Sequence, residues 1–241
     1  MSTVHLLKSR SDDSDYGRLD PYEEVIDNVN FIPVMNFETV NLDDLVELLK
    51  TPTPYQGIIV TSQRAVDVLK VALEKTEYPQ HFLSLPAFTV GPATAKRLQL
   101  VGFSQVEGAE TGNGSALADL MVEKFTNESK KFLFLAGEVH RDVLPQRLGQ
   151  NGHTIDKLIV YRTTSASNQA ALEKIAKDDW VVFFSPSHVS QIVLFIKKSD
   201  VPTRIAAIGP TTLKYLTENG VKVDAVAQQP TPESLLEAMN N

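Results

Sequence analysis

Hydroxyl side chains stand directly after short apolar runs along this chain. Thr61 and Ser62 close one such run, and Ser185 and Ser187 follow another. An apolar, β-branched run that leads through a polar turn into a helical pattern predicts a strand, a turn and a helix start. At such turns, hydroxyls and the free backbone N–H groups of the helix can donate hydrogen bonds to an anion. The chain therefore offers several turns suited to an anionic ligand.

Nine positions of this kind are candidates for ligand contacts. They are Thr61, Ser62, Gly91, Thr94, Ser185, Ser187, Gly209, Thr211 and Thr231. Taken singly, such a residue is more often a helix cap or turn residue than a ligand contact. Their coincidence at the carboxyl ends of strands favours a binding cleft. The turn 112–115 is only a weak candidate for a phosphate-binding loop, because it lacks the Walker lysine pattern and a full dinucleotide fingerprint.

Three further side chains could act on a ligand. Arg64 lies in the first turn after Ser62, and Arg141 opens a predicted helix; either could pair with a carboxylate or be a surface charge. Tyr161 ends an apolar strand where the chain is expected to leave one domain for the other. A phenol there could donate a hydrogen bond or a proton into an interdomain cleft. The alternative is a buried tyrosine that ties down a linker.

Several familiar kinds of catalytic site are excluded or disfavoured. The chain has no cysteine, so a disulfide, a thiolate metal site and a cysteine nucleophile are impossible. Its five histidines show no metal-ligand spacing and no accompanying nucleophile motif. Paired carboxylates stand in loops or at helix starts, where they are usually solvated. No motif for a metal ion or an organic cofactor is present.

Composition points to an ordinary globular protein. The 241 residues are 42% hydrophobic and 22% charged, enough to bury the core of one large or two medium domains. A net charge of −7 argues against a nucleic-acid surface. No apolar run approaches the ~18 residues that span a bilayer, and the amino terminus lacks a secretory pattern. We expect a cytoplasmic protein with no membrane or nucleic-acid partner.

A stretch of the chain occurs twice. Both copies contain an apolar run, a Gly-Pro break and a helical pattern; glycine tolerates the turn and proline suits the first helical turn. Three pairs of residues recur 118 positions apart: Gly91 and Gly209, Gly102 and Gly220, Leu117 and Leu235. Landmarks that keep their spacing over a turn, a helix end and a later helix predict two related α/β halves.

Alternating strands and helices predict two similar parallel-sheet α/β domains, joined by a two-stranded connection. The hydroxyls at the carboxyl ends of the two facing sheets favour a binding site in the interdomain cleft, where the resemblance described below implies the active site. The expected domains are an inserted one over 40–162 and a discontinuous one over 1–37 plus 167–241, with linkers near 33–40 and 161–168. Val4 to Lys8 is expected to supply the strand that the outer domain lacks. Locally, Asn41 is expected to cap a helix, and Gln169 to Lys177 to form one.

An ordered set of motifs resembles the uroporphyrinogen-III synthases. The motifs are Thr61-Ser62-Gln63-Arg64-Ala65-Val66, Val90-Gly91-Pro92-Ala93-Thr94-Ala95, Ile159-Val160-Tyr161-Arg162-Thr163, Phe183-Phe184-Ser185-Pro186-Ser187, Ala206-Ala207-Ile208-Gly209-Pro210-Thr211-Thr212 and Pro230-Thr231-Pro232. They run in order over nearly the whole chain, and the amino-terminal Leu6-Leu7-Lys8 with Asp20-Pro21-Tyr22 resembles the eukaryotic branch. One departure is His188, where some members have a glycine.

The resemblance implies a function. Members of this family close hydroxymethylbilane, a linear tetrapyrrole with acetate and propionate groups, to uroporphyrinogen III, with loss of water and inversion of the last ring. They need no metal or organic cofactor. By position, the tyrosine of the family's cleft falls on Tyr161, and the cleft threonines and serines fall on the hydroxyl positions above. We expect a monomer with this tetrapyrrole as its substrate.

Two other readings stay open at this level. Two α/β lobes joined by a hinge also suit a non-enzymatic bilobed binding module for a small molecule. Incubation with hydroxymethylbilane separates the two, because a binder would leave the type I isomer that forms spontaneously. A nucleotide-dependent enzyme is the third reading, and stabilisation by nucleotides in a thermal shift would favour it.

Overall fold

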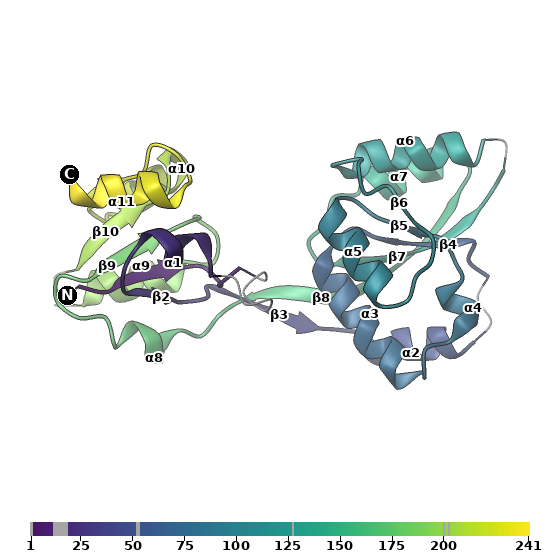
Figure 1. Ribbon diagram of the computed structural model, residues 1–241, viewed down its shortest axis with the longest axis horizontal. Coiled ribbons are helices and arrows are strands. Elements are labelled where there is room, and N and C mark those ends of the chain that lie inside the picture. The colour runs from purple at the N-terminus through teal and green to yellow at the C-terminus, as the bar shows by residue number, and fades with distance from the viewer. Residues whose placement is uncertain (1, 12–18, 52–53, 127, 200, 202) are drawn as a thin grey trace. The chain divides into compact units, whose positions relative to one another are not determined.

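The computed structural model describes residues 2–11, 19–51, 54–126, 128–199, 201 and 203–241. Its contacts divide the chain into two compact α/β units (Figure 1). Unit 1 comprises residues 1–36 and 164–241, and unit 2 comprises residues 37–163. Each unit is described by itself below. The predicted fold class, two parallel-sheet α/β domains, is confirmed.

Unit 2 is built on the six-stranded sheet in the order β3-β8-β7-β4-β5-β6. Its strands are β3 (Met35–Thr39), β4 (Gly57–Val60), β5 (Ala87–Phe88), β6 (Val106–Glu107), β7 (Lys131–Gly137) and β8 (Thr154–Ser165). β4 pairs in parallel with β5 on one side and with β7 on the other. From β4 the chain proceeds outward to β5 and β6, and then returns to β7 and β8. The sheet therefore has a topological switch point between β4 and β7, where ligands of open α/β sheets usually bind.

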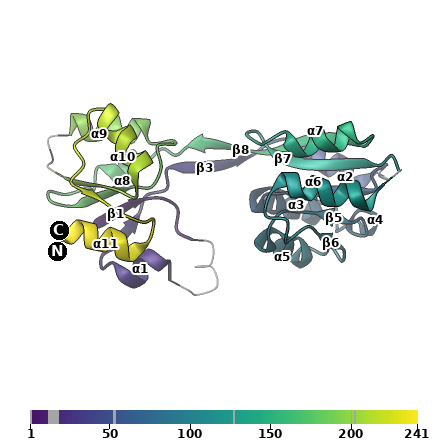
Figure 2. The ribbon, with the colours of Figure 1, turned by 90° about the horizontal axis from the view of Figure 1, so that it is seen from above.

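Helices cover both faces of this sheet. They are α2 (Leu42–Lys50), α3 (Gln63–Lys75), α4 (Gln80–Leu83), α5 (Pro92–Leu100), α6 (Gly114–Lys124) and α7 (Val143–Gln150). Successive strand residues point to opposite faces, so one face packs against α2, α3 and α5 through Val60 and Leu135. The other face packs against α6 and α7 through Phe132 and Phe134. Figures 1 and 2 show α6 and α7 side by side.

Unit 1 is built on a five-stranded sheet in the order β11-β10-β9-β1-β2. Its strands are β1 (Val4–Leu7), β2 (Val29–Phe31), β9 (Trp180–Phe183), β10 (Arg204–Ala207) and β11 (Ala225–Val226), all paired in parallel. The expectation that the amino-terminal run joins the later strands is confirmed, because Leu7 lies opposite Phe183. The switch point of this sheet lies between β1 and β9.

The helices of unit 1 are α1 (Pro21–Val25), α8 (Gln169–Leu172), α9 (Ser190–Lys198), α10 (Pro210–Glu218) and α11 (Pro232–Asn240). The expected helix from Gln169 to Lys177 is wrong in length, because α8 ends at Leu172. Asp179 explains the early end: its carboxylate accepts the N–H of Ala176 at 2.8 Å and so bends the chain into a turn.

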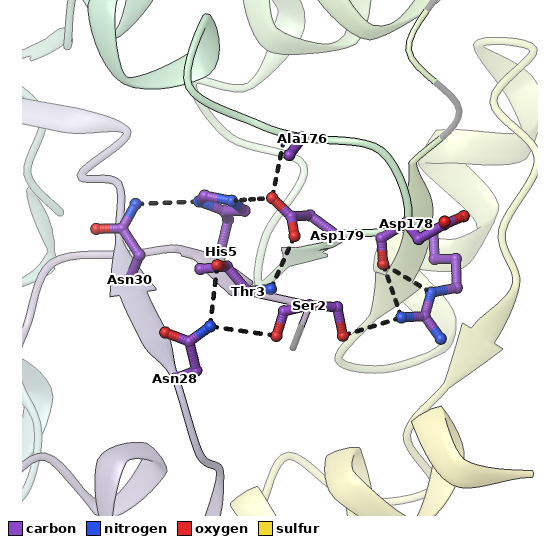
Figure 3. A network of polar contacts seen from close by, with 9 residues as sticks. Ser2, Thr3, His5, Asn28, Asn30, Ala176, Asp178 and Asp179 are labelled. Carbon is purple, nitrogen blue, oxygen red and sulfur yellow. Dashed lines mark hydrogen bonds and ion pairs between the residues drawn. The ribbon is translucent and has the colours of Figure 1, made fainter.

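Asp179 also belongs to a polar network at the amino ends of β1 and β9 (Figure 3). The carboxylate contacts His5 Nε2 at 3.1 Å and the N–H of Thr3 at 2.7 Å, and His5 Nδ1 contacts the amide of Asn30 at 3.0 Å. Burial raises the pKa of Asp179, but the backbone N–H groups and His5 outweigh it, so the pKa is lowered. The network therefore ties the strand starts together, at the edge opposite the carboxyl ends of the strands.

The duplicated stretch is confirmed as a structural repeat. In each unit a strand, a Gly-Pro turn, a helix, a short strand and a second helix follow in the same order, β5-α5-β6-α6 and β10-α10-β11-α11. The two glycines differ, however. Gly91 takes a positive φ of 82°, which favours glycine, whereas Gly209 is extended with a φ of 174°. Only the first turn needs glycine for its backbone.

Candidate active site

A cavity of about 410 Å³ lies in unit 2. It opens at the carboxyl ends of β4 and β7, the switch point of the sheet, with Thr61 following β4 and Gly137 ending β7. Its lining residues are Thr61, Ser62, Val90, Asn113, Gly114, Ser115, Phe134, Ala136, Gly137, Val139, His140, Arg141, Val143, Leu144 and Tyr161. The cavity therefore brings together four of the seven site residues predicted in unit 2: Thr61, Ser62, Arg141 and Tyr161.

Ser62 is fixed by the start of α3. It is the N-cap residue, and its hydroxyl oxygen accepts the N–H of Arg64 at 3.2 Å. The same oxygen accepts the hydroxyl of Tyr161 at 3.0 Å. Ser62 thus links the cavity tyrosine to the positive end of a 13-residue helix. Its own proton stays available to a group in the cavity.

A bulge in β8 sets the face of the sheet on which Tyr161 packs. Ile159 lies opposite Ala136, but the next residue of β7, Gly137, lies opposite Tyr161, so Val160 is the extra residue. Regular alternation would place Tyr161 on the face of Ile159, against α6 and α7. Instead both Val160 and Tyr161 pack against the cluster of α2 and α3. The sequence contains no local signal for this shift.

Gly137 makes room for the tyrosine ring. A Cβ atom added at Gly137 would lie 2.5 Å from Cζ and 2.7 Å from the hydroxyl oxygen of Tyr161. Gly137 does not have a positive φ, so it is required for space and not for backbone conformation. The last residue of β7 therefore helps to set the position of the phenol.

His140 lines the cavity, and sequence reasoning had set it aside. Its Nδ1 donates to the carbonyl oxygen of Gly137 at 2.7 Å, so Nε2 is the acceptor of Lys157 Nζ at 2.9 Å. Asp142 lies 3.1 Å from the same Nε2, and the ring packs edge-on against Phe134. Because both ring nitrogens have protein partners, His140 anchors the loop after β7. Only its position after a strand end could have indicated this.

The charge of the cavity favours an anion. Arg141 is exposed, lines the cavity and forms no ion pair with any residue that the structure describes. No described aspartate or glutamate lines the cavity. Asn113 caps α6 and accepts the N–H groups of Ser115 and Ala116 at 3.0 Å. Because Asn113, Gly114 and Ser115 line the cavity, the start of this helix also faces it. A carboxylate would be stabilised here even though the protein as a whole is acidic.

The remaining predicted residues of unit 2 lie outside the cavity lining. Arg64 is held beside Ser62, with its guanidinium 3.4 Å from Asp67 and 4.6 Å from the centre of the Phe37 ring. Gly91 is the N-cap of α5. Thr94 is only 6% exposed and is buried in that helix, which is the position of a packing residue.

Five predicted residues lie in unit 1, in turns that follow β9, β10 and β11. Ser185 accepts the N–H of Ser187 at 3.1 Å, and Thr231 caps α11 by accepting the N–H of Ser234 at 3.3 Å. Gly209 and Thr211 open α10, with Thr211 exposed. These five residues share the carboxyl edge of one sheet, as the sequence predicts, and two of them make the local hydrogen bonds of caps and turns.

Lys8 is a further residue at that edge that sequence reasoning missed. It follows β1 at the switch point, and its ammonium lies 2.6 Å from Asp20 and 5.1 Å from the ring centres of both Tyr22 and Phe31. Burial raises the pKa of Asp20, but hydrogen bonds from Lys8, Ser11 and the N–H of Tyr22 outweigh it. The pKa of Asp20 is therefore lowered to about 2. Lys8 and Asp20 form a charged pair whose carboxylate is fully buried.

Two searches of the described residues identified nothing. They contain no group of three or more His, Asp or Glu side chains placed to hold a metal ion. None of the helices in the described parts of the chain has the length and apolar character needed to cross a membrane.

Comparisons with known proteins agree with one another. The family model described as uroporphyrinogen-III synthase HemD matches residues 27–237. A uroporphyrinogen-III synthase of Schizosaccharomyces pombe is 37% identical over 250 residues, covering 98% of this chain and 95% of the relative. The enzyme of that name from Saccharomyces cerevisiae is 35% identical over 262 residues, covering 98% and 94%. A crystal structure of uroporphyrinogen-III synthetase from Helicobacter pylori covers 100% of this chain and 99% of its own, with a TM-score of 0.63 and 20% identity, and so shares the fold.

Proposed function

Because the chain belongs to the uroporphyrinogen-III synthase family, we propose that it closes hydroxymethylbilane to uroporphyrinogen III and that the unit 2 cavity is where the hydroxyl leaves. The reaction makes the protein a carbon–oxygen lyase of porphyrin and haem biosynthesis. The reading as a non-enzymatic binding module is not favoured, because the matching relatives are named as the synthase over nearly their whole length.

The observation that carries the assignment of the site is the Tyr161 phenol, which stands in the cavity and donates to Ser62 at 3.0 Å. Loss of the substrate hydroxyl needs a proton, because water is a far better leaving group than hydroxide. In our proposal the phenol turns its hydrogen bond from Ser62 to this hydroxyl. The C–O bond then breaks, water departs, and a methylene-pyrrole cation remains.

The later steps need positioning more than further acid. The cation attacks the substituted position of the last ring, and the spiro intermediate reopens and recloses at the free position. The proton lost from that ring carbon at closure balances the proton given to the leaving hydroxyl. Apolar side chains of the cavity, including Phe134, Val143 and Leu144, limit access of water to the cation.

Ser62 supports the phenol in two ways. While the substrate is absent, its oxygen holds the phenolic hydrogen and keeps the ring turned toward the cavity. When the phenol has passed its proton on, the hydroxyl of Ser62 can donate to the phenolate, and the α3 dipole stabilises the same negative charge. Thr61, beside it, is placed to donate to the substrate.

The substrate's acid groups are the second part of the proposal. Arg141 and the N-terminus of α6 would bind carboxylates at the cavity, because both border it and no described aspartate or glutamate lines it. We propose that the turns of unit 1 at Ser185, Ser187, Gly209, Thr211 and Thr231 bind further acetate and propionate groups, together with Arg64 and the Gly91 turn in unit 2. Uncharged donors suit a flexible polyacid, since they bind it without holding it too tightly.

The test is the isomer formed from hydroxymethylbilane. The purified protein is added to freshly generated substrate, and the products are oxidised to porphyrins and separated by chromatography. We expect type III to dominate, with type I formed in a matched sample containing heat-denatured protein. Type I in both samples would contradict the proposed function. A thermal shift with nucleotides, expected to be flat, tests the nucleotide-dependent reading.

The domain limits, the monomeric state and the cytoplasmic location stay predictions. Size-exclusion chromatography with light scattering checks the monomeric state, since a monomer has a mass of 26.6 kDa.

A further inference from the structure

We infer that Phe37 is a positioning residue for the reaction, holding the ring of Tyr161 and the guanidinium of Arg64 from the strand that enters unit 2. The inference rests on the proposed role of Tyr161. Phe37 belongs to none of the motifs that the sequence brought forward, and it does not line the cavity itself.

Four contacts join these residues into a closed circuit. The Phe37 ring meets the Tyr161 ring edge-on, with centres 6.2 Å apart and planes at 68°. Arg64 lies over Phe37 at 4.6 Å from the ring centre. Tyr161 donates to Ser62 at 3.0 Å, and Ser62 accepts the N–H of Arg64 at 3.2 Å. Each member is therefore held by two others, from β3, β8 and the start of α3.

The exposure of Phe37 is otherwise unexplained. The side chain is 41% exposed on β3, the edge strand of the sheet, where a charged residue is more usual. Glu38, the next residue of β3, follows that rule, since it forms an exposed ion pair with Arg162 at 2.8 Å. The Phe37 ring is covered instead by the side chains of Arg64 and Tyr161.

The circuit restricts the phenol. Tyr161 is only half-buried, and one side of its ring packs against the core cluster of α2 and α3. An edge-to-face ring pair is stabilised beyond the area it buries, which favours one ring orientation over others. Because misplacing a reacting group by about 1 Å costs up to ~100-fold in rate, loss of the ring pair should be visible in kcat.

Phe37 acts on Arg64 through the face of its ring. A guanidinium over an aromatic face is attracted by the ring's negative face, also at an exposed site. Without the ring, Arg64 keeps its contact with Asp67 at 3.4 Å but loses the contact that holds its guanidinium over Phe37, so the direction of its side chain changes. If Arg64 binds a substrate carboxylate, KM rises as well.

The experiment compares three variants in the isomer assay. Phe37→Ala should lower kcat about 10-fold and raise KM about 3-fold, from the costs of misplacement and of the lost ring contacts. Phe37→Tyr keeps the ring and should stay within about 2-fold of wild type, which is the rescue by the conservative variant. Glu38→Ala is the matched control, because it removes the ion pair between Glu38 and Arg162 on the same two strands and keeps the rings of Phe37 and Tyr161, and its kinetics should be unchanged.

A double-mutant cycle identifies the path of the effect. In a Tyr161→Phe background the reacting hydroxyl is already absent, so Phe37→Ala should lower kcat by no more than about 2-fold further. The chemical shifts of the Tyr161 ring, assigned in ¹³C-tyrosine-labelled protein, should change in Phe37→Ala and stay close to wild type in Glu38→Ala. This second readout needs no turnover.

The outcomes separate the inference from the proposed function. A slow Tyr161→Phe with a wild-type Phe37→Ala overturns the role of Phe37 and leaves the role of Tyr161 intact. Equal multiplicative losses in both backgrounds also overturn it, since Phe37 would then act independently of the phenol. If Tyr161→Phe keeps the wild-type rate, the proposed role of Tyr161 fails, and unchanged Tyr161 shifts in Phe37→Ala would separately reject the positioning itself.

Discussion

The Cβ atom that Gly137 lacks would lie 2.5 Å from Cζ of Tyr161. No Cβ atom tolerates such a contact, so one of the two groups must move when the glycine is replaced. The hydroxyl oxygen of Tyr161 is almost as close, at 2.7 Å. The position of the phenol therefore depends on the absence of a single methyl group at the end of β7.

Gly137→Ala should displace the tyrosine ring and lower kcat by about 10- to 100-fold, in keeping with the cost of moving a reacting group by about 1 Å. Overpacking at this buried site should also reduce the free energy of unfolding by about 1–3 kcal/mol. The isomer assay and urea unfolding measure the two effects.

Gly149→Ala is the matched control for this substitution. Gly149 is in α7, and a Cβ atom there would have no neighbour within 4 Å. Alanine should stabilise the helix by about 1 kcal/mol and leave turnover unchanged. An unaltered rate in Gly137→Ala would show that the ring position does not limit catalysis.

Tyr161→Phe should lower kcat by about 10- to 100-fold while the protein stays folded, because only the hydroxyl is removed and the ring keeps its contacts with Gly137 and Phe37. Chromatography of the porphyrin isomers measures the rate, and circular dichroism checks the fold. A wild-type rate would reassign Tyr161 to a structural role.

Ser62→Ala separates capping from catalysis. The variant removes the N-cap hydrogen bond of α3, which should cost about 1 kcal/mol of stability. It also frees the Tyr161 hydroxyl, so a loss of kcat smaller than that of Tyr161→Phe is expected. A loss of stability with no change in kcat would limit Ser62 to its capping role.

Local patterns were enough to predict most of the architecture. Strand ends, the Gly-Pro turns and the repeat depend on neighbouring residues, which is why the two related sheets and the place of Val4–Leu7 in the outer sheet could be derived. Side chains that bond to distant partners were misjudged. Asn41 begins α2 with a φ of 51° but makes no side-chain cap, because its amide donates to the carbonyl of Ile159 at 3.0 Å.

The candidate site was predictable only in part for the same reason. Thr61 and Ser62 follow a strand, so the switch-point rule places them correctly at the cavity. The β8 bulge that sets the face on which Tyr161 packs is a property of strand pairing, and pairing cannot be derived from alternation along one strand. Phe37 and His140 contribute through a ring contact and a carbonyl contact that have no sequence signature.

The stability of unit 1 should depend on the ionisation of Asp20. Its pKa is about 2 in the folded protein against an ordinary value of 3.8. A lowered pKa stabilises the fold above the unfolded value, and this contribution of about 2 kcal/mol is lost as the pH falls through 3.8 toward 2. The difference in free energy of unfolding between wild type and Asp20→Asn should therefore become smaller as the pH is lowered from 6 to 2.

The chain has one tryptophan, Trp180 in β9, so its fluorescence during urea unfolding follows unit 1 alone. Asp27→Asn, a substitution of an exposed residue in the same unit, is the control. Its free energy of unfolding should differ little from that of wild type at every pH. A difference for Asp20→Asn that is constant from pH 6 to pH 2 would contradict the lowered pKa.

His188→Gly should stabilise unit 1. His188 has a φ of 62°, in the left-handed region where a side chain is strained by roughly 1 kcal/mol and glycine is not. The turn thus already has the backbone of a glycine position, although it carries a histidine. Its imidazole makes a long contact of 3.3 Å with the Ser165 hydroxyl, which offsets little of the strain. The greater freedom of glycine in the unfolded chain reduces the gain to about 0.5 kcal/mol.

His188→Ala distinguishes backbone strain from loss of the imidazole, because alanine removes the ring and keeps the strained Cβ. Urea unfolding followed by Trp180 fluorescence should give the highest free energy of unfolding for His188→Gly, with wild type next and His188→Ala equal to wild type or lower. If His188→Ala is as stable as His188→Gly, strain at this φ does not govern the stability of the turn.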